Sequence, residues 1–130
     1  MWLFKNSSRI PVERAESVED EFGLRFAPTA FGSDLVQDDI SKKYFQMITV
    51  IVDVMSRFDP EIAADTWIMA EAYSDTGELV GIDHKNIPSN RFYAIGTFDI
   101  SFGASQLAAR VKVYPAKKQH RAPRLATAQG

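Results

Sequence analysis

The stretch YFQMITVIVDV, residues 44–54, decides the fold class, because it fits either a helix or a strand. Apolar residues recur at three- and four-residue steps from Leu35 to Phe58, which is the spacing of one buried helical face. The run from Ile48 to Val52 is mostly β-branched, which instead favours a strand over residues 46–54. Because the apolar stripe is long and continuous, we predict a helix over residues 35–57.

Two further helices are expected, one on each side of this segment. The first begins near Pro11 and ends before Gly23, with apolar residues at positions 12, 15, 18 and 22. Asp59-Pro60-Glu61 is a typical helix start, since it combines a capping side chain, a proline and a carboxylate. The third helix follows it, with one face at positions 62, 66, 69 and 73 and Gly77 as its stop.

Beyond Glu78 the apolar residues alternate, which indicates strands. A short strand is expected over residues 79–82, and clearer ones over 91–102 and 106–114. Phe98, Ile100 and Phe102 should face the core, and residues 102–105 should join the last two strands into an antiparallel hairpin. Residues 2–5 could add a fourth strand.

The sequence therefore predicts an α+β fold, in which three helices pack on one face of a small antiparallel sheet of three to four strands. Residues 1–114 form a single α+β domain in this interpretation. Pro115 is expected to end the last strand, and residues 115–130 form an extended basic C-terminal arm. The arm contains Leu125 as its one large apolar residue after Tyr114, too little to fold alone.

Charge is distributed very unevenly along the chain. All 17 acidic residues lie at or before Asp99, whereas six of the 15 basic residues lie after residue 109. The net charge of −2 thus hides a body of −8 and a C-terminal segment of +6. Such a separation indicates a partner, a neighbouring copy or neutralisation within the chain.

No motif in the chain carries a complete catalytic site. Asp75-Thr76-Gly77 resembles the catalytic tripeptide of aspartic proteases, but its polar neighbours favour an ordinary turn. Asp83 and His84 have no further metal-ligating residue at a suitable spacing. A pocket over Phe92, Phe98 and Phe102 competes with the need for these residues in the core. We therefore expect no enzyme activity, no metal and no cofactor.

Composition gives an expectation for location as well. There is no cysteine, the start of the chain does not resemble a secretory signal, and the longest strongly apolar run covers only residues 44–52. A bilayer-spanning helix needs about 20 residues. We expect a cytoplasmic protein or a component of an assembled particle.

The charge pattern favours a noncatalytic structural or assembly subunit of a multi-protein complex, such as a phage- or secretion-type particle. Its partners would be other subunits or further copies of itself. An accessory nucleic-acid-binding protein that uses the basic arm is the alternative, and a small-ligand-binding or enzymatic domain is the third. The residues expected to contact partners are basic, apolar or acidic: Arg110, Lys112, Lys117, Lys118, Arg121, Arg124, Leu125, Trp2, Leu3, Phe4, Glu13, Glu16, Glu19 and Asp20.

Overall fold

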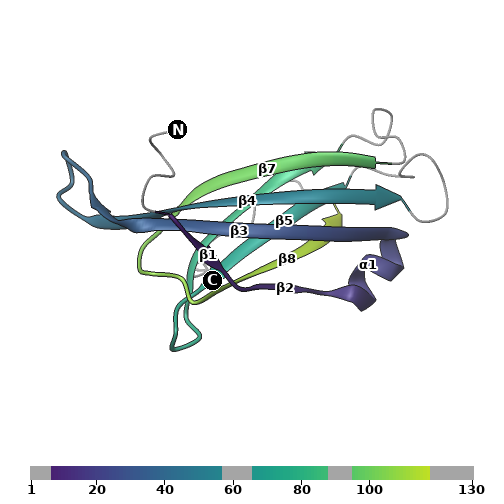
Figure 1. Cartoon of the computed structure of the whole chain (residues 1–130), viewed down its shortest axis with the longest axis horizontal. Coiled ribbons are helices and arrows are strands. Elements are labelled where there is room, and N and C mark those ends of the chain that lie inside the picture. The colour runs from purple at the N-terminus through teal and green to yellow at the C-terminus, as the bar shows by residue number, and fades with distance from the viewer. Residues whose placement is uncertain (1–6, 57–65, 88–94, 118–130) are drawn as a thin grey trace.

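The computed structural model describes residues 7–56, 66–87 and 95–117, which form eight strands and one short helix (Figure 1). The elements, in chain order, are β1 Ser8–Ile10, β2 Val12–Arg14, α1 Glu16–Phe22, β3 Leu24–Gln37, β4 Tyr44–Ser56, β5 Thr66–Tyr73, β6 Leu79–Ile87, β7 Ile95–Ala104 and β8 Arg110–Lys117.

The strands form two four-stranded sheets. Sheet A has the order β1-β3-β4-β7 and is antiparallel throughout. Sheet B has the order β2-β8-β5-β6, in which only the β2–β8 pair is parallel. The chain passes from sheet A to sheet B at Pro11, whose carbonyl accepts a hydrogen bond from the Val111 amide at 3.0 Å. The edge strand β1 of sheet A and the edge strand β2 of sheet B are thus parts of one bent stretch of chain.

The hydrophobic core lies between the two sheets. Sheet A contributes Ile48, Val50, Val52 and Val54 from β4, all fully buried, and Phe26 from β3. Sheet B contributes alternate residues of its strands, and the full set from β5 and β8 is Ile68, Ala70, Ala72, Val111 and Val113. The fold is a mainly-β sandwich, so the α+β prediction is wrong.

The predicted helix over residues 35–57 is wrong, and this error determined the fold class. Residues 44–56 form β4, the strand that lies between β3 and β7. Its even-numbered residues face the core, while Ile51 and Met55 face outward and are partly exposed. Because apolar residues occupy both faces, three- and four-residue steps could be traced through them by coincidence. The β-branched run from Ile48 to Val52 was the better signal.

The other two predicted helices are also corrected. Only residues 16–22 of the first are helical, and Val12–Arg14 instead pair with β8. Gly23 ends α1 as expected, with a left-handed φ of 68°. Thr66–Tyr73, expected in the third helix, is a strand flanked by β6 and β8 and buried along most of its length; residues 57–65 lie outside the described residues. Within the described ranges, no helix has the length and apolar character needed to cross a membrane.

The expected C-terminal strands are present with different bounds and partners. β6 continues to Ile87, β7 covers residues 95–104, and β8 begins at Arg110 and continues through Pro115 to Lys117. Phe98, Ile100 and Phe102 do pack in the core. The predicted hairpin is wrong, because β7 pairs with β4 in sheet A and β8 pairs with β5 and β2 in sheet B. Residues 2–5 and 91–94 lie outside the described ranges.

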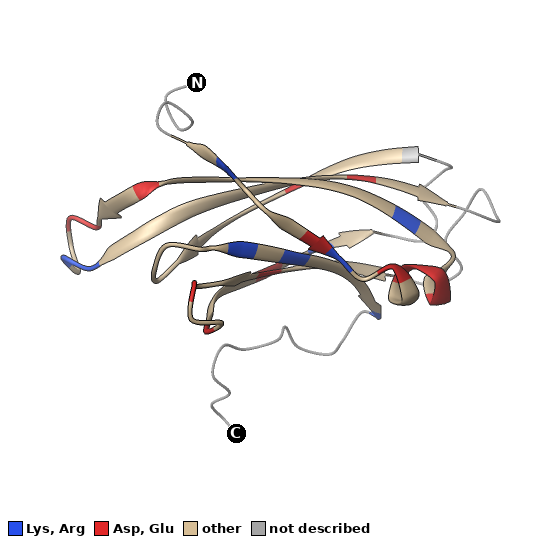
Figure 2. Ribbon diagram, turned by 60° about the horizontal axis from the view of Figure 1, so that its bottom comes forward, with Lys and Arg blue, Asp and Glu red and all other residues tan. Residues whose placement is uncertain are grey.

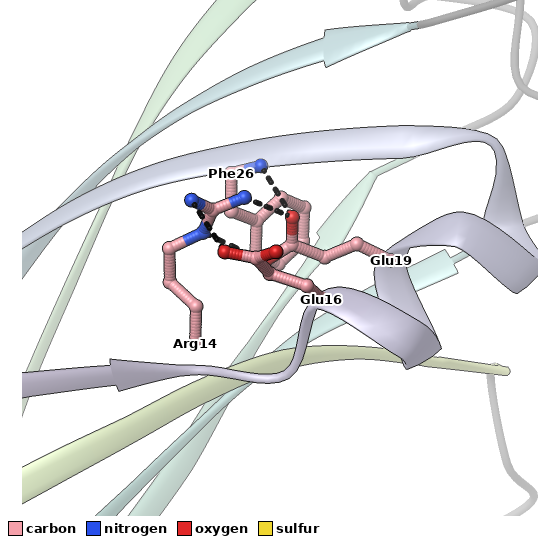
Figure 3. Close-up of polar contacts among 4 residues, drawn as sticks. All are labelled: Arg14, Glu16, Glu19 and Phe26. Atoms are coloured by element: carbon pink, nitrogen blue, oxygen red, sulfur yellow. Dashed lines mark hydrogen bonds and ion pairs between the residues drawn. The ribbon is translucent and has the colours of Figure 1, made fainter.

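One buried carboxylate joins the start of the chain to sheet A (Figure 3). Glu19 on α1 accepts hydrogen bonds from the Arg14 guanidinium at 2.7 and 3.2 Å and from the Phe26 amide at 3.2 Å. Its side chain is 2% exposed, whereas that of Glu16, 3.4 Å from Arg14, is 72% exposed. The hydrogen bond with Glu19 raises the pKa of Arg14. Glu19 therefore connects β2, α1 and β3.

Removing this carboxylate should destabilise the fold. Glu19→Ala leaves the buried Phe26 amide and the partly exposed Arg14 guanidinium without their acceptor, so we expect a loss of about 3 kcal/mol in the free energy of unfolding. Glu16→Ala is the matched control, and its exposed ion pair should contribute less than about 0.5 kcal/mol. Urea denaturation measures both values, and equal losses for the two variants would contradict the role assigned to Glu19.

Candidate protein-docking surface

The β3–β4 hairpin extends beyond sheet B at one end of the sandwich (Figure 1). These two strands pair from Leu24 opposite Ser56 to Gln37 opposite Tyr44. At this end the β5–β6 turn covers residues 74–78, and the β7–β8 connection covers residues 105–109. We call residues 33–45, 74–78 and 105–109 together the hairpin end.

Large apolar side chains are concentrated on the hairpin end. Among the described residues, seven large hydrophobic side chains are exposed, and five of them lie there. Ile40 is 93% exposed, Tyr44 57% and Leu107 53%, with Leu35 and Val36 also more than two-fifths exposed. An exposed apolar patch that is rimmed by polar residues is typical of a protein–protein contact.

The exposure follows from the register of the hairpin. Leu35 lies opposite Gln46, and Gln37 lies opposite Tyr44. Residues opposite each other project to the same side of a sheet, and Gln46 is on the side that faces the core. A bulge between Gly32 and Leu35 brings Leu35 onto this side as well. Leu35 and Tyr44 thus continue the inward face of sheet A beyond the main core, where they are exposed.

The hairpin tip has a fixed conformation. The Asp38 carboxylate accepts hydrogen bonds from the amides of Ile40 at 3.1 Å and Ser41 at 2.7 Å, and the bond from Ser41 lowers the pKa of Asp38. The Asp38 amide donates to the Lys43 carbonyl at 2.8 Å, and Lys42 has a positive φ of 64°. The tip therefore holds Ile40 in solvent by a defined set of local bonds.

A shallow depression lies between the hairpin and the β7–β8 connection. Its volume is about 370 Å³, and its walls are Leu35, Tyr44, Asp75, Ser105, Gln106, Leu107, Ala108 and Ala109. Its lining is a mixture of apolar and polar residues, among them the acidic Asp75.

Gln46 fixes the two sides of this depression relative to each other. Its side chain is buried, donates to the Ser33 carbonyl at 2.9 Å, and accepts from the Ala108 amide at 2.9 Å. Gly32 leaves room for this arrangement, because a Cβ at that position would clash with Gln46 Nε2 and approach Ile10 Cδ1 to 2.6 Å. The bulge and the β7–β8 connection are therefore held together by one buried amide.

The hairpin end is acidic. It carries five carboxylates, those of Asp34, Asp38, Asp39, Asp75 and Glu78, against the two ammonium groups of Lys42 and Lys43. Figure 2 shows acidic and basic positions together at the tip of the hairpin and further acidic positions in the turn below it. In the described parts of the chain, neither Asp39 nor Asp75 has an ion-pair partner. The surface combines apolar contacts with an excess of negative charge.

Three of the residues expected to contact partners lie together on the outer face of sheet B. Arg110 forms an ion pair with Glu13 at 3.2 Å, and its guanidinium lies 4.4 Å from the centre of the Tyr73 ring. Lys112 lies opposite Glu13 in the parallel β2–β8 pair. Part of the basic C-terminal charge is therefore neutralised within the chain.

The remaining expected contact residues are more widely separated. Glu16 and Glu19 both bind Arg14, Asp20 lies exposed on α1, and Lys117 is exposed at the end of β8. The other residues in this set lie outside the described ranges: Trp2, Leu3, Phe4, Lys118, Arg121, Arg124 and Leu125. Their role in partner contacts stays a prediction.

A network of tyrosines covers the middle of sheet B's outer face. Glu71 accepts hydrogen bonds from the hydroxyls of Tyr73 and Tyr114, each at 2.6 Å. Burial and then the bond to Glu71 raise the pKa of Tyr73 to about 12, and the same two causes raise the pKa of Tyr114. Since each phenol donates to the carboxylate, this network is satisfied internally.

The other candidate chemical residues do not converge. Asp75 and Gly77 lie in the β5–β6 turn, where Gly77 has a φ of 86° and donates to the Ser74 carbonyl. His84 lies on β6 and stacks on Trp67 with ring centres 3.9 Å apart. Over the described ranges, no group of three or more His, Asp or Glu residues could hold a metal ion. Phe98 and Phe102 are part of the core, and Phe92 lies outside those ranges.

Sequence reasoning missed the exposure of Leu35, Ile40, Tyr44 and Leu107. It placed the first three in the apolar stripe of the predicted helix over residues 35–57 and Leu107 in the predicted strand over residues 106–114. The mainly polar run from Gln37 to Lys43 separates two apolar segments, and this was the sequence signal for a hairpin connection.

Comparison of the chain with protein-family models, curated proteins and solved structures finds no match in any of the three. The function is therefore inferred from the geometry and chemistry of the surface.

Loss of the Gln46 amide should loosen the hairpin end. Gln46→Leu keeps the side chain's size but leaves the Ser33 carbonyl and the Ala108 amide without partners, so we expect a loss of about 2 kcal/mol in unfolding free energy. Hydrogen exchange at the Ala108 amide should accelerate at the same time. Gln37→Leu, which removes one exposed bond to the Lys42 carbonyl, is the control and should change stability by less than about 0.5 kcal/mol. Unchanged exchange at Ala108 in Gln46→Leu would contradict this role.

The tyrosine network should make the fold sensitive to alkali. In the folded state the pKa of Tyr73 is about 12, above its ordinary value of 10.0, so the unfolded chain loses this proton first. Stability contributed by the network is complete below about pH 9 and falls as the pH rises from about 10 to 12. Urea denaturation at pH 8, 10 and 11 should show a steeper decline for the wild type than for Tyr73→Phe/Tyr114→Phe. Tyr44→Phe, outside the network, should follow the wild type.

Proposed function

We propose that this protein is a noncatalytic assembly subunit that docks other protein subunits through the hairpin end. The observation that carries the proposal is the concentration of five of the seven exposed large hydrophobic side chains on this one end. Burying such side chains on a partner is the usual source of binding free energy in protein complexes.

Three features of the hairpin end support a docking role. Ile40 is held in solvent by the bonds of Asp38, and the walls of the depression are joined by Gln46. A surface with few freely rotating parts loses less conformational entropy when it binds. The surrounding carboxylates give the contact a preferred partner charge, which is positive. The proposal places the subunit in the cytoplasm or in an assembled particle.

Site-specific photocrosslinking in cells that naturally make the protein tests this function. A benzophenone amino acid at position 40 should give discrete adducts with protein subunits, and the protein should elute in a complex larger than its monomer. Ile40→Asp should abolish that complex, because it places a charge in an apolar contact. Ile51→Asp is the control, since Ile51 is exposed on the outer face of sheet A, away from the hairpin end.

Two results would overturn the proposal. One is a monomeric protein with equal, diffuse crosslinking at positions 40 and 51. The other is binding of labelled DNA or RNA that weakens steeply with salt and depends on Lys118, Arg121 and Arg124, in which case the basic arm of a nucleic-acid-binding protein is the better assignment.

A further inference from the structure

We propose that the partner at the hairpin end is a second copy of this chain, whose basic C-terminal segment, residues 118–130, lies in the depression beside Leu107. This inference rests on the proposed docking function and adds the identity of the occupant. It makes the contact head-to-tail, because the two surfaces involved are different.

The direction of β8 places Lys117 and the hairpin end at opposite ends of the molecule. β8 begins at Arg110, opposite Tyr73 at the hairpin end, and ends at Lys117, opposite Thr66 at the far end of β5. Its eight residues cover roughly 25 Å at about 3.3 Å per residue. The segment that follows Lys117 therefore starts at the end remote from the depression.

The length of this segment favours a neighbouring copy over the chain's own depression. Leu125 is eight residues beyond Lys117, so it can reach at most about 28 Å from it in a fully extended chain. A return along β8 would use nearly all of that reach before the segment could turn over the edge of sheet B. If a neighbouring copy lies along the long axis of the molecule, the C-terminal segment of the first copy can reach the depression of the second without turning back.

The chemistry of the segment matches that of the depression. Lys118, Arg121 and Arg124 carry three positive charges, and the hairpin end has an excess of three negative charges. Leu125 is the segment's one large apolar residue, and the walls of the depression include Leu35, Tyr44 and Leu107 as well as Asp75. Arg124 and the adjacent Leu125 can thus place a cation near Asp75 and an apolar side chain against Leu107.

The acidic helix α1 is a weaker receptor for the same segment. Glu16 and Glu19 already bind Arg14, and Glu19 is buried. All three large hydrophobic side chains that line the depression, Leu35, Tyr44 and Leu107, are at least 44% exposed. The hairpin end therefore offers both charge and apolar area, and α1 offers mainly charge.

Complementary variants of the full-length protein test this arrangement. Leu107→Asp removes the receptor and keeps the arm, whereas Leu125→Asp removes the arm's apolar contact and keeps the receptor. In sedimentation velocity, the wild type should form larger species as its concentration rises. Raising NaCl from 50 to 500 mM should weaken the affinity of this self-association at least tenfold. Each variant alone should self-associate at least tenfold more weakly than the wild type.

The mixture of the two variants gives the decisive result. The intact arm of Leu107→Asp can bind the intact receptor of Leu125→Asp, so an equimolar mixture should form a dimer and nothing larger. Met55→Ser, which changes an exposed apolar residue outside the hairpin end, is the control and should associate like the wild type. If Leu107→Asp does not retain the wild-type thermal unfolding profile, the experiment uses the variant Tyr44→Ser in its place.

The remaining outcomes overturn the inference. A mixture that stays monomeric, or variants that associate like the wild type, would show that arm and receptor do not meet. A wild type that is monomeric at every concentration would exclude a second copy as the partner. If adducts at position 40 with other subunits persist in that case, the docking function stands and only the identity of the occupant is wrong.

Discussion

The unequal lengths of the strands in the two sheets determine where this molecule has a surface without a covering layer. β3 and β4 have 14 and 13 residues, whereas β5 and β8 have eight each. At about 3.3 Å per residue, five residues correspond to roughly 16 Å of strand. The inward face of sheet A carries apolar side chains on both sides of the buried Gln46, so those beyond the main core, Leu35 and Tyr44, are exposed.

Buried polar groups then give each end of the sandwich a definite shape. Glu19 joins α1 to β2 and β3 at one end, and Gln46 joins the bulge of β3 to the β7–β8 connection at the other. Each side chain binds groups from two different elements or connections, so a hydrophobic replacement would leave those groups unpaired. The exposed apolar residues at the hairpin end are therefore part of an ordered structure, which suits them for repeated contact with one kind of partner.

Some features of this structure could be predicted from the sequence, and others could not. The alternation at Phe98, Ile100 and Phe102, the stop at Gly23 and the turn at Asp75-Thr76-Gly77 could be predicted, because each depends on local geometry. Residues 44–56 could not be assigned reliably, since a central strand with apolar residues on both faces loses its period of two. Strand pairing was equally inaccessible: β7 and β8 are consecutive but belong to different sheets, a result of contacts with β4 and β5. The candidate docking residues were misassigned for the same reason, because their exposure depends on where sheet B ends.

The charge separation in the sequence divides into two parts in the folded protein. Arg110 and Lys112 belong to sheet B, where Arg110 pairs with Glu13 and Lys112 lies between Glu13 and Glu71 in the strand registers. Arg110 is thus neutralised within one copy, and Lys112 lies beside two carboxylates of the same copy. The basic excess that is left begins at Lys117, whereas the hairpin end has an acidic excess, and β8 separates the two along its length. In the proposed head-to-tail contact, the basic segment after Lys117 of one copy faces the acidic hairpin end of the next, and the opposite charges attract. If copies meet through this proposed contact, its two surfaces differ, so each added copy offers a new free receptor and a new free arm, and growth ends only if a ring closes.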